Sequence, residues 1–350
     1  MKNCIVLFSV LLAACSPSPD FKSFPKIDMH VHLETTDDSF VQVLDDNNFK
    51  LLTLVTRSES QEAIQKDLDF ARNLHNGHPK TIGYATTISM EGFGEPDWQE
   101  NTIAGLQKSF DEGAIAVKIW KDIGMTFRNA DSTFIFLDDP RFDPILDFIE
   151  SQNKTLVNHT AEPKNCWLPL NEMTVGGDSS YFAEHPQYHM YLHPDYPSRE
   201  ELLAARDRML IKHPNLRYVG CHLGSMEWNV DEQAEWLDRF PNYGLDMAAR
   251  IVHFKVQDRE KVRDFIIKYQ DQLLYGTDIG IGDSEVATSE SIKNIISDVW
   301  LVDWEYFSTD HLLTQNDKVK EYKGLALPPS VLKKIYHDNA LKMFPGLGQN

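Results

Sequence analysis

The feature of this sequence that most constrains its fold is a regular alternation of strand-like and helix-like segments. Eight apolar or β-branched runs recur along the chain, as expected of parallel strands that are buried on both faces. The segments between them have apolar residues at three- and four-residue spacing and predict helices, most clearly at 198–213, 231–239, 258–269 and 328–344. The strand-like runs are residues 27–33, 51–56, 81–88, 114–120, 155–160, 216–223, 243–248 and 273–277.

This alternation predicts an α/β fold, a single (β/α)8 TIM barrel over residues 26–345, with an insertion at about 162–197 after the fifth strand. The competing α/β fold, a doubly wound sheet, usually has a glycine-rich phosphate turn after its first strand. Here the first strand ends in His30-Val31-His32-Leu33, without glycine. The number of strands and the missing glycine turn both favour the barrel.

The first residues resemble an export signal rather than part of the fold. Lys2 precedes an apolar run, 5–14, that is too short to span a bilayer as a stable helix. The run ends in Leu-Ala-Ala-Cys15, which resembles the lipobox of bacterial lipoproteins, in which the Cys is lipidated. We therefore expect a signal peptide at 1–14, a tether at 15–25 and a membrane anchor at Cys15. A plain secretory signal with a chance Cys at its boundary is the alternative.

The charge and the cysteine count limit which partners and which cellular compartment are expected. The chain carries 34 Lys and Arg against 53 Asp and Glu, a formal net charge of −19, which would repel nucleic acid. An exported lipoprotein would lie on the periplasmic or outer side of its membrane. The two thiols left within the barrel, Cys166 and Cys221, are too few for a disulfide framework, and we expect both to be free. A homo-oligomer is one alternative for the quaternary structure.

The candidate site is built from histidines and one aspartate at strand ends. His30 and His32 are two residues apart on the first strand, so their side chains point to the same face, where two imidazoles suit a metal ion. With 13 His in 350 residues, chance alone gives roughly 0.5 such pairs per chain, so the pair needs structural context. That context is present: His159, His222 and Asp278 end the fifth, sixth and eighth strands, at the face where barrel enzymes keep their active sites. Core histidines with satisfied hydrogen bonds are the alternative.

The strand-end residues and the C-terminal segment resemble those of a known family. Residues 28–32, DMHVH, together with His159, His222 and Asp278 on later strands, look like the amidohydrolase superfamily. Residues 335–344, IYHDNALKMF, resemble the C-terminal helix of one branch, which contains amidohydrolase-2 type hydrolases and aminocarboxymuconate-semialdehyde decarboxylase.

The resemblance implies a metal-dependent enzyme. His30, His32, His159 and Asp278 would bind a divalent metal, with zinc expected, and His222 would be a second-metal ligand or a catalytic residue beside it. Such a set leaves a position for a water, whose pKa the metal lowers to about 7, and Asp278 would shuttle its proton. The metal or His222 would polarise the carbonyl of the substrate.

Two further residues are assigned roles by position. Lys118 alternates with Ala116 and Trp120 on the fourth strand and should point into the barrel. It is either a carboxylated bridge between two metals, as in binuclear relatives, or a buried unmodified lysine. Arg250 follows the seventh strand and either binds a substrate carboxylate or closes an ion pair at the barrel rim. The aromatic-rich insertion at 162–197 would act as a lid.

Three functions follow, in order of preference. The first is a metal-dependent hydrolase, in which metal-activated water attacks an amide, ester or lactone carbonyl of a small molecule and Asp278 shuttles the proton. The second is a carboxy-lyase (decarboxylase) with the same metal site, which an Arg that binds a carboxylate would favour. The third, a catalytically inactive lipid-anchored binding protein, has no need of the acid–base residues.

Overall fold

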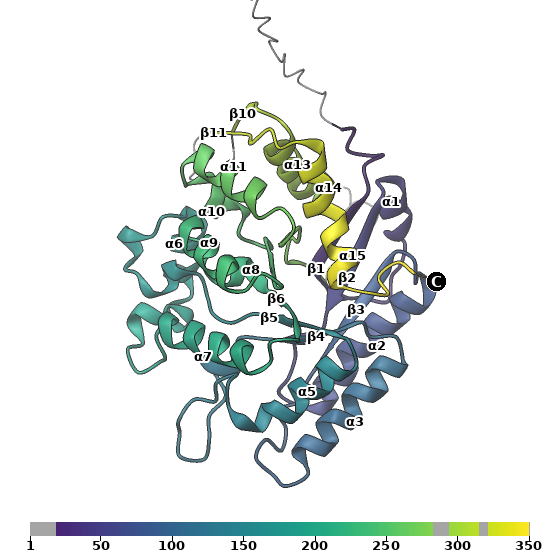
Figure 1. Ribbon diagram of the computed structural model, residues 1–350, viewed down its shortest axis with the longest axis vertical. Helices are drawn as coiled ribbons and strands as arrows, with labels where there is room; N and C mark the ends of the chain where they lie inside the picture. The colour runs from purple at the N-terminus through teal and green to yellow at the C-terminus, as the bar shows by residue number, and fades with distance from the viewer. Residues whose placement is uncertain (1–18, 283–293, 315–320, 350) are drawn as a thin grey trace, which may run out of the picture.

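The computed structural model describes residues 19–282, 294–314 and 321–349, whose main feature is a sheet of nine parallel strands surrounded by helices (Figure 1). The strand order is β8-β7-β6-β5-β4-β3-β2-β1-β9, so neighbours in the sheet are neighbours in the chain except at β1 and β9. The strands are β1 (Lys26–Glu34), β2 (Phe49–Leu54), β3 (Ile82–Thr87), β4 (Ala116–Ile119), β5 (Thr155–Asn158), β6 (Arg217–Gly220), β7 (Gly244–Asp246), β8 (Leu273–Leu274) and β9 (Ile279–Gly282).

The sheet closes through two short strands, β8 at the start of the eighth predicted strand (273–277) and β9, which lies beyond that range and was not predicted. β8 pairs with β7, and β9 pairs with β1. Between them, the Met29 amide donates to the Tyr275 carbonyl at 3.2 Å, and the Asp278 amide donates to the His30 carbonyl at 2.8 Å. Gly276 permits this close approach, because a Cβ there would lie 2.9 Å from the Cβ of His30. The predicted (β/α)8 barrel is confirmed, with its last strand divided.

Helices follow the strands as the alternation predicts. The helix predicted at 198–213 is α7 (Arg199–Lys212), which Ser198 and Glu201 begin with a reciprocal capping box. Among the described residues, the other helices outside the insertion are α1 (Val41–Asp46), α2 (Gln61–Gly77), α3 (Trp98–Asp111), α4 (Asp122–Met125), η1 (Pro140–Phe142), α5 (Asp143–Ser151), α8 (Cys221–Gly224), α9 (Val230–Arg239), α10 (Ile251–Lys255), α11 (Arg259–Lys268), η6 (Ile296–Trp300), α13 (Leu301–Ser308), α14 (Pro329–Lys333), η7 (Lys334–Asp338) and α15 (Asn339–Met343). A small antiparallel pair, β10 (Leu312–Leu313) and β11 (Tyr322–Lys323), lies outside the barrel.

The insertion after β5 has no further strand among its described residues. It consists of short helices joined by turns, the longest being α6. Its elements are η2 (Lys164–Trp167), η3 (Leu170–Glu172), α6 (Gly176–Glu184), η4 (Pro186–Tyr188) and η5 (Met190–Leu192).

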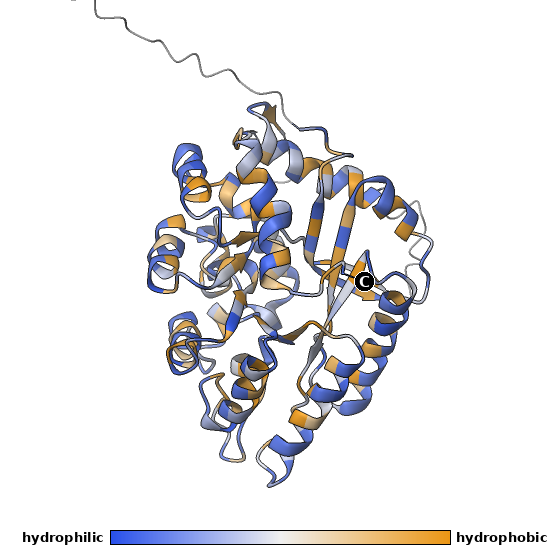
Figure 2. Cartoon of the chain, turned by 45° about the vertical axis from the view of Figure 1, so that its right-hand side comes forward, coloured by the Kyte–Doolittle hydropathy of each residue, from blue (hydrophilic) through white to orange (hydrophobic). Residues whose placement is uncertain are grey.

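Two hydrophobic layers hold the barrel. The inner layer takes alternate residues from the strands, such as Leu52 and Leu54 of β2, and adds Phe344 and Leu347 after α15, which close the amino-terminal end of the barrel. The outer layer packs the other strand faces, including Phe49 and Leu51 in β2, against the helices. In Figure 2, hydrophobic residues recur between hydrophilic ones along these peripheral helices.

A β-bulge in β1 sets which residues face the barrel interior. Asp28 pairs with Leu51 and Val31 pairs with Thr53, so β1 holds one extra residue between these two pairs. Asp28 accepts the His30 amide at 3.2 Å through its side chain, which satisfies a donor at the irregular part of the ladder. The same carboxylate accepts Thr277 Oγ1 at 2.6 Å and Trp300 Nε1 at 3.0 Å, so it joins β1 to the eighth strand and to η6.

The C-terminal helical segment supports the closure of the barrel from outside. η7 is a turn of π-helix, and its Ile335 carbonyl accepts the Tyr275 amide at 2.8 Å. Asn339, the next residue after η7, donates to the carbonyls of Gln270 and Leu273 at 2.7 and 2.8 Å. The predicted helix at 328–344 therefore forms as α14, η7 and α15, and it holds the strand that brings Asp278 to the site.

Other predictions concern the thiols and the membrane. Cys166 and Cys221 are both free and buried, as expected. The signal peptide at 1–14 and the lipidation site Cys15 lie outside the described residues. Within the described part of the chain, none of the helices is both long enough and apolar enough to cross a bilayer.

Replacing Asn339 tests the support of the eighth strand. Asn339→Ala leaves two largely buried carbonyls without their side-chain donor and should lower the free energy of unfolding by about 2–4 kcal/mol. Denaturant titration of the full chain measures this change. Asn101→Ala, on the exposed face of α3, is the matched control and should change the free energy of unfolding by less than about 0.5 kcal/mol. Equal effects of the two substitutions would contradict the proposed support.

Candidate active site

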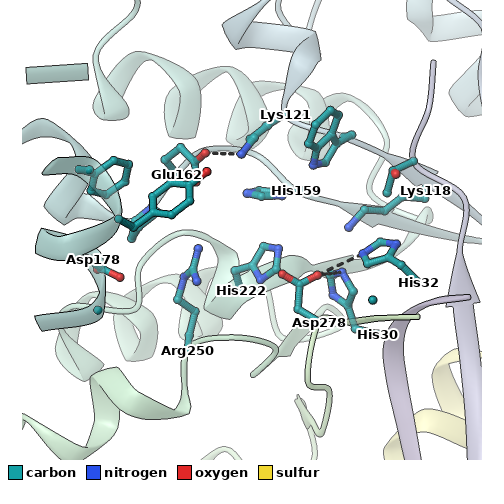
Figure 3. Close-up of a pocket in the computed structure, with 17 residues that line it drawn as sticks. His30, His32, Lys118, Lys121, His159, Glu162, Asp178, His222, Arg250 and Asp278 are labelled. Atoms are coloured by element: carbon teal, nitrogen blue, oxygen red, sulfur yellow. Dashed lines mark hydrogen bonds and ion pairs between the residues drawn. The ribbon is translucent and has the colours of Figure 1, made fainter. Parts of the chain in front are cut away.

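A cavity of about 500 Å³ opens at the carboxyl ends of the barrel strands (Figure 3). Every catalytic, metal-ligating or substrate-binding residue predicted from the sequence lines it. The lining residues are His30, His32, Thr56, Lys118, Trp120, Lys121, His159, Glu162, Pro163, Gly177, Asp178, Tyr181, Phe182, His222, Arg250, Asp278 and Gly280.

The histidines of β1 present the same ring nitrogen to Asp278. Nδ1 of His32 lies 2.8 Å from the Leu54 carbonyl, which only accepts, so Nδ1 carries the proton and a neutral ring has its lone pair on Nε2. Nδ1 of His30 donates to Asp246 at 2.9 Å, so Nε2 of this ring is likewise the nitrogen that faces Asp278. The Nε2 atoms of His30 and His32 lie 3.2 and 3.1 Å from Oδ1 of Asp278.

His222 is placed by a left-handed turn after β6. Residues 222–225 have φ between 56° and 63°, and three of them are not glycine, a conformation that costs about 1–2 kcal/mol per such residue. Nδ1 of His222 donates to the Ala248 carbonyl at 2.9 Å, so Nε2 of the neutral ring has no proton. Burial is the main cause that lowers the pKa of His222 to about 3. The neutral ring suits a metal ligand and has no Nε2 proton to donate to a carbonyl.

His159 has a buried nitrogen without a partner. Its Nε2 forms no hydrogen bond with any described residue. Burial first, and His222 second, lower the pKa of His159 well below its usual range, so the ring is neutral. Its ring centroid lies 4.2 Å from that of His222. A buried imidazole nitrogen that has no hydrogen-bond partner and lies next to a second imidazole is the property expected of a metal ligand.

Asp278 is the acidic member of the group and lies where the eighth strand divides. Its φ of 69° is in the left-handed region and turns the carboxylate toward His30 and His32. Burial by itself would raise the pKa of Asp278, but His30, His222 and His32 hold it well below its usual range. The carboxylate therefore stays ionised.

These residues fit a divalent cation. The Nε2 atoms of His30 and His32 lie 3.2 and 3.1 Å from one carboxylate oxygen of Asp278, and such contacts require a proton or a metal ion between the nitrogens and the oxygen. Candidate ligand atoms of His30, His222 and Asp278 all lie within 4.8 Å of one another. His32 touches the same Asp278 oxygen, and His159 lies against His222. The cluster thus contains the four predicted ligands, and His222 lies among them.

Asp246, at the end of β7, was missed by the sequence analysis. It is fully buried and accepts Nδ1 of His30 at 2.9 Å, the His222 amide at 2.8 Å and the Ala248 amide at 3.0 Å. Burial would raise the pKa of Asp246, yet His30 lowers it to about 2. The rule that selected His159, His222 and Asp278, a titratable residue at the end of a strand, would also have selected Asp246.

Lys118 points into the barrel, as its strand position predicts. The side chain is fully buried, and Nζ donates to Sγ of Cys221 at 2.8 Å. This contact corresponds to the buried unmodified lysine, one of the two alternatives for Lys118. Carboxylation of Lys118 stays a prediction.

Arg250 lies in the cavity wall between Asp178 and His222 (Figure 3). Its Nη1 donates to the Ala249 carbonyl at 3.1 Å, and its buried Nε has no hydrogen-bond partner among the described residues. Lys121, another cation that lines the cavity, forms an ion pair with Glu162. The guanidinium therefore keeps donor capacity for an anionic group in the cavity.

The insertion supplies one wall of the cavity, and its role as a lid stays a prediction. α6 contributes Asp178, Tyr181 and Phe182, and Asp178 lies 3.5 Å from Nε2 of His253 in α10. His189 and His193 hydrogen-bond to carbonyls of the insertion itself at 2.8 and 2.9 Å. These two histidines therefore stabilise the insertion and do not line the cavity.

The charge on His30 predicts a pH-dependent metal affinity. Burial and Lys118 lower the pKa of His30, but the negative charges of Asp246 and Asp278 outweigh them, so the pKa lies well above 6.5. A metal ion must displace this proton, so affinity for zinc should rise with pH below that pKa, about tenfold per unit for each proton displaced. Competition with a chromophoric chelator measures the slope. His213→Gln, at a histidine paired with Asp143 and Asp147, should keep the wild-type slope. A pH-independent affinity would contradict the assignment of His30.

Comparison with known proteins places the chain in a family. The sequence matches the amidohydrolase family profile over residues 120–346, more than half of the chain, a range that includes His159, His222 and Asp278. His30 and His32 precede the matched range. No curated protein matches the sequence.

Solved structures share the fold at low sequence identity. They include 2,6-dihydroxybenzoate decarboxylase in complex with 2,6-dihydroxybenzoate (15% identity, TM-score 0.56, 92% of this chain and 99% of that chain). The same enzyme from Rhizobium has 15% identity and a TM-score of 0.55, over 92% of this chain and 98% of that chain. An uncharacterized TIM-barrel protein from Bordetella bronchiseptica has 15% identity and a TM-score of 0.50, over 92% of this chain and 100% of that chain. Together with the family match, the barrel and its cluster of histidines lead to one conclusion: this chain belongs to the amidohydrolase family.

Proposed function

We propose that this protein is a metal-dependent hydrolase that acts on an ester, lactone or amide carbonyl of a small carboxylated molecule. The observation that carries the proposal is the placement of Asp278. Its ionised carboxylate faces a cavity and touches the Nε2 atoms of two histidines. A carboxylate kept ionised beside a substrate can take a proton from water, which is the first requirement of hydrolysis.

The metal site would comprise His30, His32, His159 and Asp278, with His222 as a further ligand. Imidazole nitrogens with one carboxylate favour zinc, and we propose one ion per chain. Bound there, the ion would lower the pKa of a water and polarise the carbonyl under attack. Asp278 would accept the proton of the attacking water and pass it to the leaving group.

The rest of the cavity would select the substrate. Arg250 has an unused donor and would bind a carboxylate of the substrate, since a guanidinium forms paired bonds with that group. Trp120, Tyr181 and Phe182 would pack against its apolar part. The cavity volume of about 500 Å³ suits a small molecule rather than a polymer.

Decarboxylation is the second candidate. Two structures with the same fold are 2,6-dihydroxybenzoate decarboxylases, and Arg250 suits a carboxylated substrate in either reaction. In this reaction the bond between the substrate carbon and its carboxylate breaks, carbon dioxide leaves, and the carbon takes a proton. Asp278 would then have to deliver a proton, so it would have to begin the reaction protonated.

One set of assays separates the two reactions. Zinc-loaded protein is tested on esters, lactones and carboxylated aromatic compounds, with carbon dioxide release and acid release measured in parallel. We expect hydrolysis without carbon dioxide. Release of carbon dioxide would replace the hydrolase proposal with the lyase, and purified protein that binds no divalent ion would refute both.

The role of Asp278 is tested by Asp278→Asn. The amide keeps the shape and a carbonyl oxygen but cannot accept a proton, so turnover should fall by about 10²–10⁴-fold. Metal content, measured on the same sample, should stay near that of the wild type because the four histidines remain. Full turnover in this variant would refute the proton shuttle. Asp303→Asn, at a buried aspartate outside the cavity that accepts Tyr275 at 3.0 Å, is the control.

We also propose that the protein is an exported lipoprotein anchored through Cys15. The support is the signal-like run at 5–14 and the Leu-Ala-Ala-Cys boundary, followed by a Ser- and Pro-rich tether. In a bacterial host, Cys15→Ser should move the protein from the detergent phase to the aqueous phase in a phase-partition experiment. Cys166→Ser, at a buried thiol, should leave it in the detergent phase. Membrane retention of the Cys15 variant would contradict the anchor.

A further inference from the structure

We propose that Asp246 is a positioning residue, which fixes the tautomer of His30 and the place of His222 from behind the cavity. The inference rests on the proposed metal-dependent function and goes beyond it, because β7 supplies none of the predicted ligands. Asp246 is fully buried and does not line the cavity, so it acts through other residues.

The two oxygens of Asp246 have different partners. Oδ2 accepts the Nδ1 proton of His30 at 2.9 Å. Oδ1 accepts the backbone amides of His222 at 2.8 Å and Ala248 at 3.0 Å. One carboxylate thus joins three strands, because His30 is on β1, His222 follows β6 and Asp246 ends β7.

The contact with His30 decides which nitrogen faces the cavity. A carboxylate only accepts, so it keeps a proton on Nδ1, and Nε2 is then the nitrogen that faces Asp278 and can bind a cation. Such carboxylate–histidine pairs orient ligands in metal sites.

The contact with His222 acts on the main chain. The His222 amide begins the left-handed turn, and without the bond to Asp246 it would be a buried donor with no acceptor. The adjoining Ala248 carbonyl accepts Nδ1 of His222 at 2.9 Å, so the end of β7 also fixes this ring. Residues 246–248 therefore orient the imidazoles from two other strands.

An alternative role for Asp246 is to bind a second metal with His30 and Cys221, whose candidate ligand atoms lie within 4.8 Å of one another. The contacts argue against it. Both oxygens of Asp246 already accept hydrogen bonds, Nδ1 of His30 donates one of them, and Lys118 donates to the Cys221 sulfur. These groups satisfy one another without an ion.

Asp246→Asn tests the inference directly. The amide oxygen can keep both backbone amides, but the NH2 group then faces Nδ1 of His30, so the imidazole proton must move to Nε2, where the metal binds. Zinc affinity of the full chain, measured against a chromophoric chelator, should fall by about 10–100-fold. Asp303→Asn should keep the wild-type affinity. A folded Asp246→Asn chain with wild-type affinity would overturn the proposal.

A second measurement needs no variant and excludes a merely structural role. In zinc-loaded wild type labelled with ¹⁵N-histidine, long-range ¹H–¹⁵N spectra should show His30 with a proton on Nδ1 and the metal on Nε2. A His30 with no proton on Nδ1 would overturn the proposal even if Asp246→Asn does not fold. Absence of zinc binding by the wild type would instead refute the metal site and with it this inference. Zinc binding that Asp246→Asn leaves intact would refute the positioning role alone.

Discussion

The extra residue in β1 is the constraint on which the site depends. Side chains alternate along a strand, so a regular β1 with Ile27 and Met29 inside the barrel would direct His30 and His32 outward. The bulge between Asp28 and Val31 changes this phase, and both histidines reach the interior above an apolar layer. Asp28 stabilises the irregular backbone by accepting the His30 amide. One local irregularity thus converts the wall of a hydrophobic core into the wall of a polar cavity.

Barrel closure and site formation involve the same few bonds. The Asp278 amide donates to the His30 carbonyl, while the Asp278 side chain contacts the His30 ring. The eighth strand is therefore joined to β1 by backbone and side chain at one residue pair. The left-handed conformation of Asp278 is compatible with this arrangement because pairing with β1 resumes in β9, directly after it. The same residue pair therefore contributes to barrel closure through its backbone and to the candidate site through its side chains.

The fold and the histidines and aspartate of the candidate metal site could be predicted because they follow from local patterns. Eight buried runs give the barrel, and a histidine or aspartate at a strand end identifies the carboxyl-terminal face. The spacing of His30 and His32 predicts that they share a face, but the face itself depends on the bulge, which no residue pattern marks. The role of His222 likewise depends on a left-handed turn and on the Ala248 carbonyl, both of which arise from tertiary contacts. The strand-end position of Asp246 is visible in the sequence, but its role is not. An aspartate that contacts only other protein groups has the same sequence pattern as one that binds a metal.

The direction in which the chain enters the barrel has a consequence for access. Residues 19–25 lead into the amino end of β1, where Phe21 packs beside Phe49 at the start of β2. The cavity opens at the opposite rim, formed by the carboxyl ends of the strands. If the proposed anchor at Cys15 is present, the chain is attached to the bilayer through the end of the barrel opposite to the cavity mouth. Its substrates would then arrive from the aqueous space, and a molecule dissolved in the lipid phase would have no direct path to Asp278.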